Sequence, residues 1–484
     1  MTPVRVRFAP SPTGRLHIGG LRTALFNYLY AKTHKGTFVL RIEDTDQKRT
    51  VDGAVADIVR TLNAYGLVPD EGAYKPEELS LEHGSAGPYT QSKRRPMYQA
   101  AANTLLEQGS AYPCFCTAER LQQLRASQEN QHLPPGYDGV CRALPTATAK
   151  QRMNQGEPHV IRFAMPKEGT ITVEDLVRGK VQFARTTLED SVLLKTDGYP
   201  TYHLANVVDD HAMKISHVIR AEEWLPSLPL HVQLYQAFGW EVPAFAHIPL
   251  ILGPGRKKLS KRDGAMPAAD YLKEYLPSAM INFIAFLGWN PKTEQEFYPS
   301  LETLVQDFNL SNIHKAGAIF DTEKLKHLNR LHMRALTPVA LAHHAGLALS
   351  EAEAERYIPL AIDRATTLPE VAAAIHFLVA DALTYDTATL IPNKGEAQAT
   401  KNILQSLQAF WQTLENEWGN AETLKTATLA WIVKQELTNL NVLWPARVAL
   451  TGQRHSPDVF DVAIALGKVR TVKRLEQGIS KLKT

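Results

Sequence analysis

The sequence predicts an α/β protein with an all-α C-terminal part: a Rossmann-like parallel sheet domain that carries an inserted domain, then a connecting domain, then helices. Two observations lead to this fold class. Residues 4–8 read as a strand, a Pro/Gly-rich turn and a helical stretch near 20–33 follow, and residues 37–42 read as a second strand. This order is a β-α-β unit, whose crossover makes the two strands parallel. From about residue 325 onward the pattern is that of amphipathic helices, as in 371–383.

A segment of different character separates the two halves of the sheet domain. It contains every cysteine of the chain and a short strand at 159–163, and an α/β pattern returns after it, with strands at 191–194 and 217–220 and a helix at 202–211. We expect this second stretch to complete the parallel sheet. The predicted boundaries are 1–107 and 191–245 for the sheet domain, 108–190 for the insertion, 246–324 for the connecting domain, and 325–380 and 381–484 for two helical subdomains.

Composition excludes several classes of protein. A chain of 484 residues is too long for one core, and 44% hydrophobic with 21% charged residues is typical of a folded protein. The net charge of +3 means that a polyanionic partner must be met by local basic surface. Because the sequence has no apolar signal core and no charge-free apolar run of about 18 residues, we expect a soluble cytoplasmic protein without a membrane partner.

The turn after the first strand, PSPTGRLHIGG at residues 10–20, is a candidate phosphate site. Glycines at a helix start let a ligand approach the backbone, and the free amides and positive dipole of that terminus favour an anion. His17 can then donate a hydrogen bond to a phosphate oxygen whose charge grows in the transition state. An ordinary strand-to-helix turn with a surface histidine explains this turn alone equally well.

A basic segment, RKKLSKRDG at residues 256–264, follows Gly253-Pro254-Gly255. Clustered lysines beside glycines can close over a triphosphate and neutralise the leaving pyrophosphate without a protein nucleophile. A solvated basic loop or a contact to an RNA backbone is the alternative. Neither motif is decisive by itself.

The two motifs together resemble the paired ATP signatures of the class I aminoacyl-tRNA synthetases. Within that class the chain is similar to the glutamyl and glutaminyl branch through RIEDTD at 41–46, DGYPTYHLANVVDDH at 197–211 and VIRAEEW at 218–224. The tail, with ARVALTG at 446–452 and LGK at 466–468, resembles the end of bacterial glutamyl-tRNA synthetases. The resemblance covers essentially the full chain.

This resemblance implies a pocket for glutamate, whose two carboxylates and one ammonium need fixed donors and one carboxylate. Glu43 is the expected partner of the α-ammonium. The alternative is that Glu43 forms a surface ion pair with Lys48 or Arg49, and that Tyr202 belongs to the core. The residues that match the family's glutamate contacts are Arg7, Ala9, Ser11, Glu43, Tyr202, Asn206 and Arg220.

The resemblance also implies ATP, accompanied by Mg²⁺, as the second substrate. The α-carboxylate of glutamate attacks the α-phosphorus to give glutamyl-adenylate and pyrophosphate, and a terminal ribose hydroxyl of tRNA(Glu) then attacks the acyl group. No general base is assigned, because the sequence offers no isolated candidate. The residues that match the catalytic positions are His17, Lys258 and Lys261, and the further ATP contacts are Gly19, Glu223, Trp224 and Ser260.

The three cysteines, Cys114, Cys116 and Cys141, lie in the insertion, the part with which the family handles the tRNA acceptor end. Three thiolates can hold Zn²⁺, but a closed structural site has four ligands. Some family members place a histidine where this chain has Ala143, so the fourth ligand is left to Tyr137, His132 or a more distant group. Buried cysteines that act as small apolar residues are the alternative.

The connecting domain corresponds to the family's stem-contact region, and the helical part to its anticodon-binding region. Helices there favour the bacterial glutamyl type, because glutaminyl enzymes of the eukaryotic type carry β-barrels and shortened paralogues lack the region. Arg364 falls about where an arginine favours strict reading of tRNA(Glu); a solvated helix arginine is the alternative. With all sites on one chain, we expect a monomer.

Two other functions would use the same features. A nucleotidylyltransferase acting on a small molecule can carry the first motif, but usually lacks a long helical C-terminal part. A catalytically silent tRNA-binding protein would have damaged signatures, whereas His17, Glu43, Lys258 and Lys261 are all present.

Overall fold

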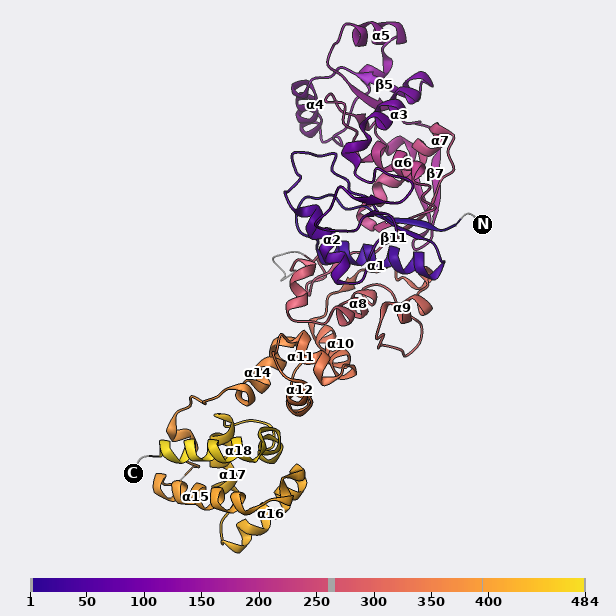
Figure 1. The fold of residues 1–484 in the computed structure, drawn as a ribbon. Helices are drawn as coiled ribbons and strands as arrows, with labels where there is room; N and C mark the ends of the chain where they lie inside the picture. The colour runs from indigo at the N-terminus through magenta and orange to yellow at the C-terminus, as the bar shows by residue number, and fades with distance from the viewer. Residues whose placement is uncertain (1–2, 260–265, 394, 483–484) are drawn as a thin grey trace. The chain divides into compact units, whose positions relative to one another are not determined.

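The computed structural model describes residues 3–259, 266–393 and 395–482 of the chain (Figure 1). The described residues form two compact units. The first runs to Leu325, apart from the short segment Lys273–Leu276, which belongs to the second unit with the residues from Lys326 onward. This segment is held by two backbone groups: Leu276 N–H donates to Asn329 Oδ1 at 2.9 Å, and the Glu274 carbonyl accepts from Leu368 N–H at 2.8 Å.

The first unit contains the predicted parallel arrangement. Strand β1 pairs in parallel with β2, and β10 pairs in parallel with β11. The two pairs meet where Ser216 N–H, just before β10, donates to the Arg5 carbonyl of β1 at 3.0 Å. Strand β7 extends the sheet from β11, and β8 is antiparallel to β7, so the sheet is mixed. These strands are β1 (Arg5–Phe8), β2 (Thr37–Leu40), β7 (Thr170–Asp175), β8 (Gly179–Ala184), β10 (His217–Ala221) and β11 (Ala244–Ile248).

The strand expected at 191–194 has a different partner from the predicted one. It forms β9 (Val192–Leu194), which pairs antiparallel with β6 (Val160–Phe163), and β6 in turn pairs antiparallel with β5 (Ala111–Cys114). The expectation that it completes the parallel sheet is therefore wrong. A short apolar strand identifies a buried position but not its neighbour, and here the chain returns from β8 to the sheet of the inserted segment.

Helices cover the sheet as the apolar patterns require. The predicted stretch near 20–33 is α1 (Ile18–Thr33), and the helix expected at 202–211 is α6 (Tyr202–Ala212). Leu204, Val207 and Val208 of α6 pack in a hydrophobic core of this unit. The other elements of the unit are α2 (Ala54–Ala64), β3 (Gly72–Ala73), β4 (Glu82–His83), α3 (Arg95–Glu107), α4 (Ala118–Asn130), α5 (Thr146–Asn154), α7 (Leu228–Phe238), β12 (Ile251–Leu252), α8 (Pro277–Ala285), α9 (Leu301–Asp307) and β13 (Ala318–Ile319).

Helices and no strands make up the regular structure of the second unit in the described residues, orange to yellow in Figure 1. The helix predicted at 371–383 begins earlier, because Thr367 and Glu370 form a capping box, and it ends at Val379. No described helix has the length and apolar character that crossing a bilayer requires. The helices are α10 (Thr322–Ala335), α11 (Pro338–His344), α12 (Glu351–Tyr357), α13 (Pro359–Ile362), α14 (Leu368–Val379), α15 (Ala397–Thr413), α16 (Ala421–Lys434), α17 (Asn439–Thr451) and α18 (Val459–Lys481).

Candidate active site

A cavity of about 1270 Å³ opens at the carboxyl ends of β1, β2 and β10, the edge at which open α/β sheets bind their ligands. It brings together residues that are far apart in the chain. Two further predicted residues, Ser260 and Lys261, lie outside the described residues. The predicted site residues that line the cavity are Arg7, Ala9, Ser11, His17, Gly19, Glu43, Tyr202, Asn206, Arg220, Glu223, Trp224 and Lys258.

His17 caps the N-terminus of α1 and faces the cavity. Its Nδ1 atom accepts a hydrogen bond from Gly20 N–H at 3.1 Å. Because a backbone N–H can only donate, Nδ1 is unprotonated and the neutral ring carries its proton on Nε2. Desolvation, followed by the positive charge of Lys258, lowers the pKa of His17. The ring therefore presents one N–H donor beside the positive end of a helix, which suits a phosphate oxygen.

The space around the His17 ring favours a glycine at position 19. A Cβ atom at Gly19 would lie 3.2 Å from His17 Nδ1 and 3.3 Å from its Cε1, tighter than ordinary contact. The sequence interpretation gave this glycine only the task of admitting a ligand to the backbone. The structure adds that it leaves room for the histidine ring.

The two phosphate-handling motifs lie next to each other. Before the undescribed residues, Lys258 Nζ pairs with Glu223 Oε2 at 2.6 Å. After them, Pro267 forms an isolated bridge with His17, and Ala268 N–H donates to the Leu16 carbonyl at 2.7 Å. The Lys258–Glu223 pair is exposed, and exposed pairs contribute little to stability. A phosphate can therefore replace Glu223 as the partner of Lys258.

A buried network of charges lies behind the part of the cavity wall that Arg7 and Glu43 line. Asp210 Oδ1 accepts from Arg7 Nε at 3.1 Å and from Arg41 Nη1 at 2.5 Å, and Arg41 Nη2 donates to Glu43 Oε1 at 2.9 Å. Burial alone would raise the pKa of Asp210, but Arg7 and Arg41 outweigh it and hold this pKa below its usual value. Burial raises the pKa of Glu43, opposed by Arg41. An incoming ammonium would favour the charged form of Glu43.

Arg7 and Arg220 differ in what their guanidinium groups can still bind. Within the described part of the chain Arg7 has one hydrogen-bond partner, Asp210 at Nε, which leaves Nη1 and Nη2 for a ligand. Arg220 is 4% exposed, and each of its nitrogens donates to a group without formal charge: Nε to a histidine, Nη1 to Tyr202 Oη at 3.1 Å and to a second histidine, and Nη2 to the Trp224 carbonyl at 3.3 Å. Among the described residues, no carboxylate forms an ion pair with Arg220.

Sequence reasoning missed part of this wall. It treated surface ion pairs of Glu43 with Lys48 or Arg49 as the alternative, but the partner of Glu43 is Arg41, which is fully buried. Arg41 lies two positions before Glu43 in the segment directly after β2, where Ile42 forms an isolated bridge with Thr90. Asp210 lies four positions after Asn206 and so shares its face of α6.

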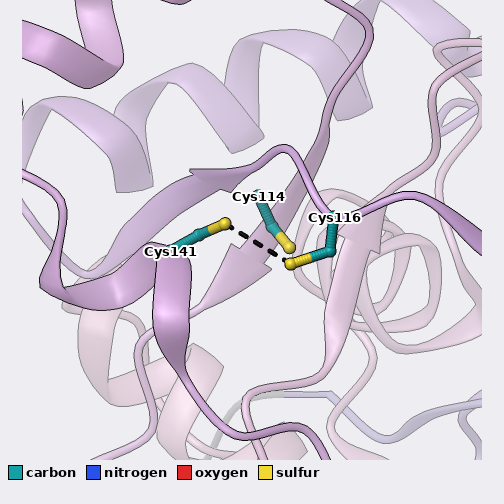
Figure 2. Close-up of side chains that lie close together, drawn as sticks. All are labelled: Cys114, Cys116 and Cys141. Atoms are coloured by element: carbon teal, nitrogen blue, oxygen red, sulfur yellow. Dashed lines mark hydrogen bonds between the residues drawn. The ribbon is translucent and has the colours of Figure 1, made fainter. Parts of the chain in front are cut away.

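The cysteines of the inserted segment meet at one point (Figure 2). The Sγ atoms of Cys114, Cys116 and Cys141 all lie within 4.8 Å of one another, with 3.6 Å between those of Cys116 and Cys141. Two thiolates on one tetrahedral Zn²⁺ are separated by roughly 3.8 Å. Tyr137 Oη lies 3.4 Å from the Cys114 sulfur and 3.8 Å from that of Cys116. His132, the other suggested ligand, is not part of the cluster, and Tyr137 Oη is an oxygen that the structure places beside the sulfurs.

Arg364 lies in the second unit, two residues after the end of α13, and is exposed. Its Nη2 atom donates to the Ser456 carbonyl at 2.9 Å. The contact fixes the side chain near the start of α18. Its suggested role in anticodon reading stays a prediction.

Comparison with known proteins divides the chain near residue 325, as the two compact units of the structure do. The sequence matches the family of class I tRNA synthetases (E and Q), catalytic domain, over residues 3–327, and an anticodon binding domain over residues 324–479. A glutamate–tRNA ligase of Finegoldia magna is 39% identical, with 99% of this chain and all of that protein aligned; one of Dehalococcoides mccartyi is 41% identical, with 99% and 98% aligned.

A solved structure points to the same family. The crystal structure of a glutamate tRNA ligase from Elizabethkingia meningosepticum, in complex with its amino acid, superposes with a TM-score of 0.89 at 38% identity, and covers 99% of this chain and 100% of its own. The match includes the helical part that separates a tRNA ligase from a small-molecule nucleotidylyltransferase. The chain therefore belongs to the glutamate–tRNA ligase family of class I tRNA synthetases, with the catalytic and anticodon-binding domains of that family.

Proposed function

We propose that this chain activates L-glutamate with ATP and transfers it to the 3′ end of tRNA(Glu), with both substrates bound in the cavity at the carboxyl ends of β1, β2 and β10. One observation carries this proposal. Among the residues that line this cavity, Arg7, Arg220 and Glu43 suit an amino acid with two acidic groups. The helix N-terminus with His17, together with Lys258, suits phosphates. An enzyme that joins a carboxylate to a nucleotide needs both sets side by side.

The free edge of Arg7 and the uncompensated charge of Arg220 take the carboxylates of glutamate. Glu43 takes the α-ammonium, and Tyr202 and Asn206 complete the pocket together with Ala9 and Ser11. Asn206 Nδ2 lies 3.4 Å from Glu43 Oε1, so it helps to hold this carboxylate in place.

The nucleotide lies along the α1 terminus, with Glu223 and Trp224 near its nucleoside. The glutamate carboxylate attacks the α-phosphorus, and pyrophosphate leaves. His17 donates through Nε2 to a phosphate oxygen, while Lys258, and Lys261 from the sequence motif, neutralise the charge that builds up on pyrophosphate. The hydroxyl of Ser260, from the same motif, donates a hydrogen bond to the nucleotide. Mg²⁺ bound with the nucleotide supplies further neutralisation of the phosphates. A ribose hydroxyl of the tRNA then attacks the activated carbonyl.

For tRNA we propose the division made from the sequence: acceptor end at 108–190, stem at 246–324, and anticodon at 325–380 and 381–484, with Arg364 reading the anticodon. We propose one Zn²⁺ in the acceptor-binding segment, held by Cys114, Cys116 and Cys141 with Tyr137 as fourth ligand. The metal has a structural task there, because four protein ligands leave no open position. We also propose a cytoplasmic monomer.

Exchange of radioactive pyrophosphate into ATP, with glutamate and purified tRNA(Glu), tests the proposal. We expect exchange that depends on glutamate, and esterification of tRNA(Glu). Lys261→Ala should reduce exchange much more than it reduces glutamate or tRNA binding, because its charge acts as pyrophosphate leaves. Equal losses in all three would point to a structural role for Lys261, and no exchange under any tRNA condition would refute the proposal.

A further inference from the structure

Two buried histidines that the proposed reaction does not use hold the guanidinium of Arg220. His247, on β11, accepts at Nε2 from Arg220 Nε at 3.0 Å. His231, on α7, lies with Nδ1 3.1 Å from Arg220 Nη1. Both histidines are 0% exposed. The two histidines come from different elements, and they contact two different nitrogens of one guanidinium, Nε and Nη1.

The protonation of each ring follows from this geometry. A guanidinium can only donate, so the ring nitrogen that faces it must be unprotonated in both histidines. The proton of the neutral His247 ring is then on Nδ1, 2.6 Å from Asp175 Oδ2, and that of His231 is on Nε2, 3.1 Å from His203 Nδ1. Burial lowers the pKa of both histidines, although Asp175 opposes this at His247. Each ring is thus fixed in one neutral tautomer by a second residue behind it.

Asp175 is itself held in place. It accepts backbone N–H groups of Val177 at 3.0 Å, Arg178 at 2.8 Å and His247. Its negative charge is therefore shared among backbone donors and the His247 ring, and it does not touch Arg220. Asp175 therefore orients Arg220 indirectly, through the neutral ring of His247. A carboxylate in direct contact with Arg220 would instead form an ion pair and neutralise its charge.

Three other buried arginines, Arg7, Arg41 and Arg94, have carboxylate partners. Arg7 and Arg41 bond directly to Asp210, and Arg94 bonds to Asp209, so their charges are balanced by carboxylates inside the protein. Arg220 is equally buried, and its hydrogen-bond partners among the described residues are all neutral. A buried charge without a counter-ion is costly, and an anionic ligand relieves that cost.

We propose that His231 and His247 are positioning residues for glutamate binding: they fix Arg220 with neutral acceptors and so leave its full charge for a substrate carboxylate. This inference rests on the proposed role of Arg220 in the glutamate pocket. His203 and Asp175 act behind them by setting the tautomers. Arg220 then selects a ligand with a carboxylate over one with a carboxamide at the same position, because a neutral carboxamide would leave the charge of Arg220 unbalanced.

A pair of variants of equal size isolates the charge of the acceptor. In His231→Asn a neutral oxygen can replace Nδ1 as the acceptor for Arg220, whereas His231→Asp places a carboxylate there. The readout is the KM for glutamate and for ATP in pyrophosphate exchange with tRNA(Glu) present. We expect His231→Asn to stay within about threefold of the unmodified enzyme and His231→Asp to raise the KM for glutamate about tenfold or more, which corresponds to about 1.4 kcal/mol, with the KM for ATP unchanged.

Arg220→Ala, in the same assay, separates this inference from the proposed function. If Arg220→Ala leaves the KM for glutamate unchanged, the role of Arg220 is wrong and the inference falls with it. If Arg220→Ala raises this KM but the Asn and Asp variants of His231 behave alike, the glutamate pocket stands and the inference alone is overturned. Should the His231 variants fail to fold, His247→Gln and His247→Glu form a second matched pair, for which the same difference in KM is expected and equal behaviour is again the overturning result.

Discussion

His17 has two separable tasks in this structure, and substitutions can remove them one at a time. Nδ1 caps α1 by accepting from Gly20 N–H, while Nε2–H faces the cavity. Loss of an N-cap costs about 0.5–2 kcal/mol of helix stability. Loss of a donor to the charge that grows in a transition state costs about 2.7–4 kcal/mol, or roughly 10²–10³ in rate. His17→Ala loses both tasks. His17→Asn keeps a capping oxygen but has no donor at the position of Nε2.

Two measurements distinguish the tasks. Hydrogen exchange of the amides in the first turn of α1 reports the cap, because exchange of these groups follows local opening. Pyrophosphate exchange with tRNA(Glu) reports activation. We expect faster amide exchange in His17→Ala only, and a drop in activation of roughly 10²–10³ in both variants. Near-normal activation in His17→Asn would refute the reasoning, because the histidine would then act only as a cap.

Two further predictions concern the charged wall and the metal. Asp210→Asn should destabilise the first unit by about 3–5 kcal/mol, because Arg7 and Arg41 lose a buried counter-charge; calorimetric melting measures this. The pKa of Asp210 lies below its usual value of about 3.9. The charged Asp210 therefore stabilises the fold fully above about pH 3.9, and this stabilisation is lost as the pH falls through the lowered pKa. The difference in stability between the unmodified protein and Asp210→Asn should shrink only in strong acid. Cys141→Ser should lower zinc bound to the purified protein well below one equivalent, as measured by atomic emission, and an unchanged metal content would contradict the proposed site.

The sequence patterns predicted the elements better than their partners. The helix α6 and the strand β10 appear where the apolar periodicity places them, because each has a long enough pattern of its own. The pairing of β9 with β6 was not predictable in this way, since a three-residue strand carries no information about its neighbour. The same limit applies to the site. Motifs named residues that line the cavity, whereas the contact of Arg41 with Asp210 joins positions 169 residues apart and only the folded chain brings them together.

The histidines around Arg220 show this limit most clearly. His231 and His247 lie outside the motifs that identified the family, in an apolar helix and an apolar strand where a histidine reads as an ordinary core residue. The role of each histidine depends on which ring nitrogen faces Arg220 and on which residue, His203 or Asp175, contacts the other ring nitrogen. Both are properties of geometry rather than of residue order.

The segment Lys273–Leu276 has a consequence for anyone who wishes to divide or recombine this enzyme. The anticodon-binding unit is not one continuous stretch of chain, so a single cut near residue 325 does not release it whole. A fragment that starts there lacks the N–H that Asn329 accepts and the carbonyl that Leu368 N–H meets. Leu276, 1% exposed, would remain on the catalytic fragment without its cover. A chimera that exchanges anticodon specificity should therefore transplant these four residues together with the helices.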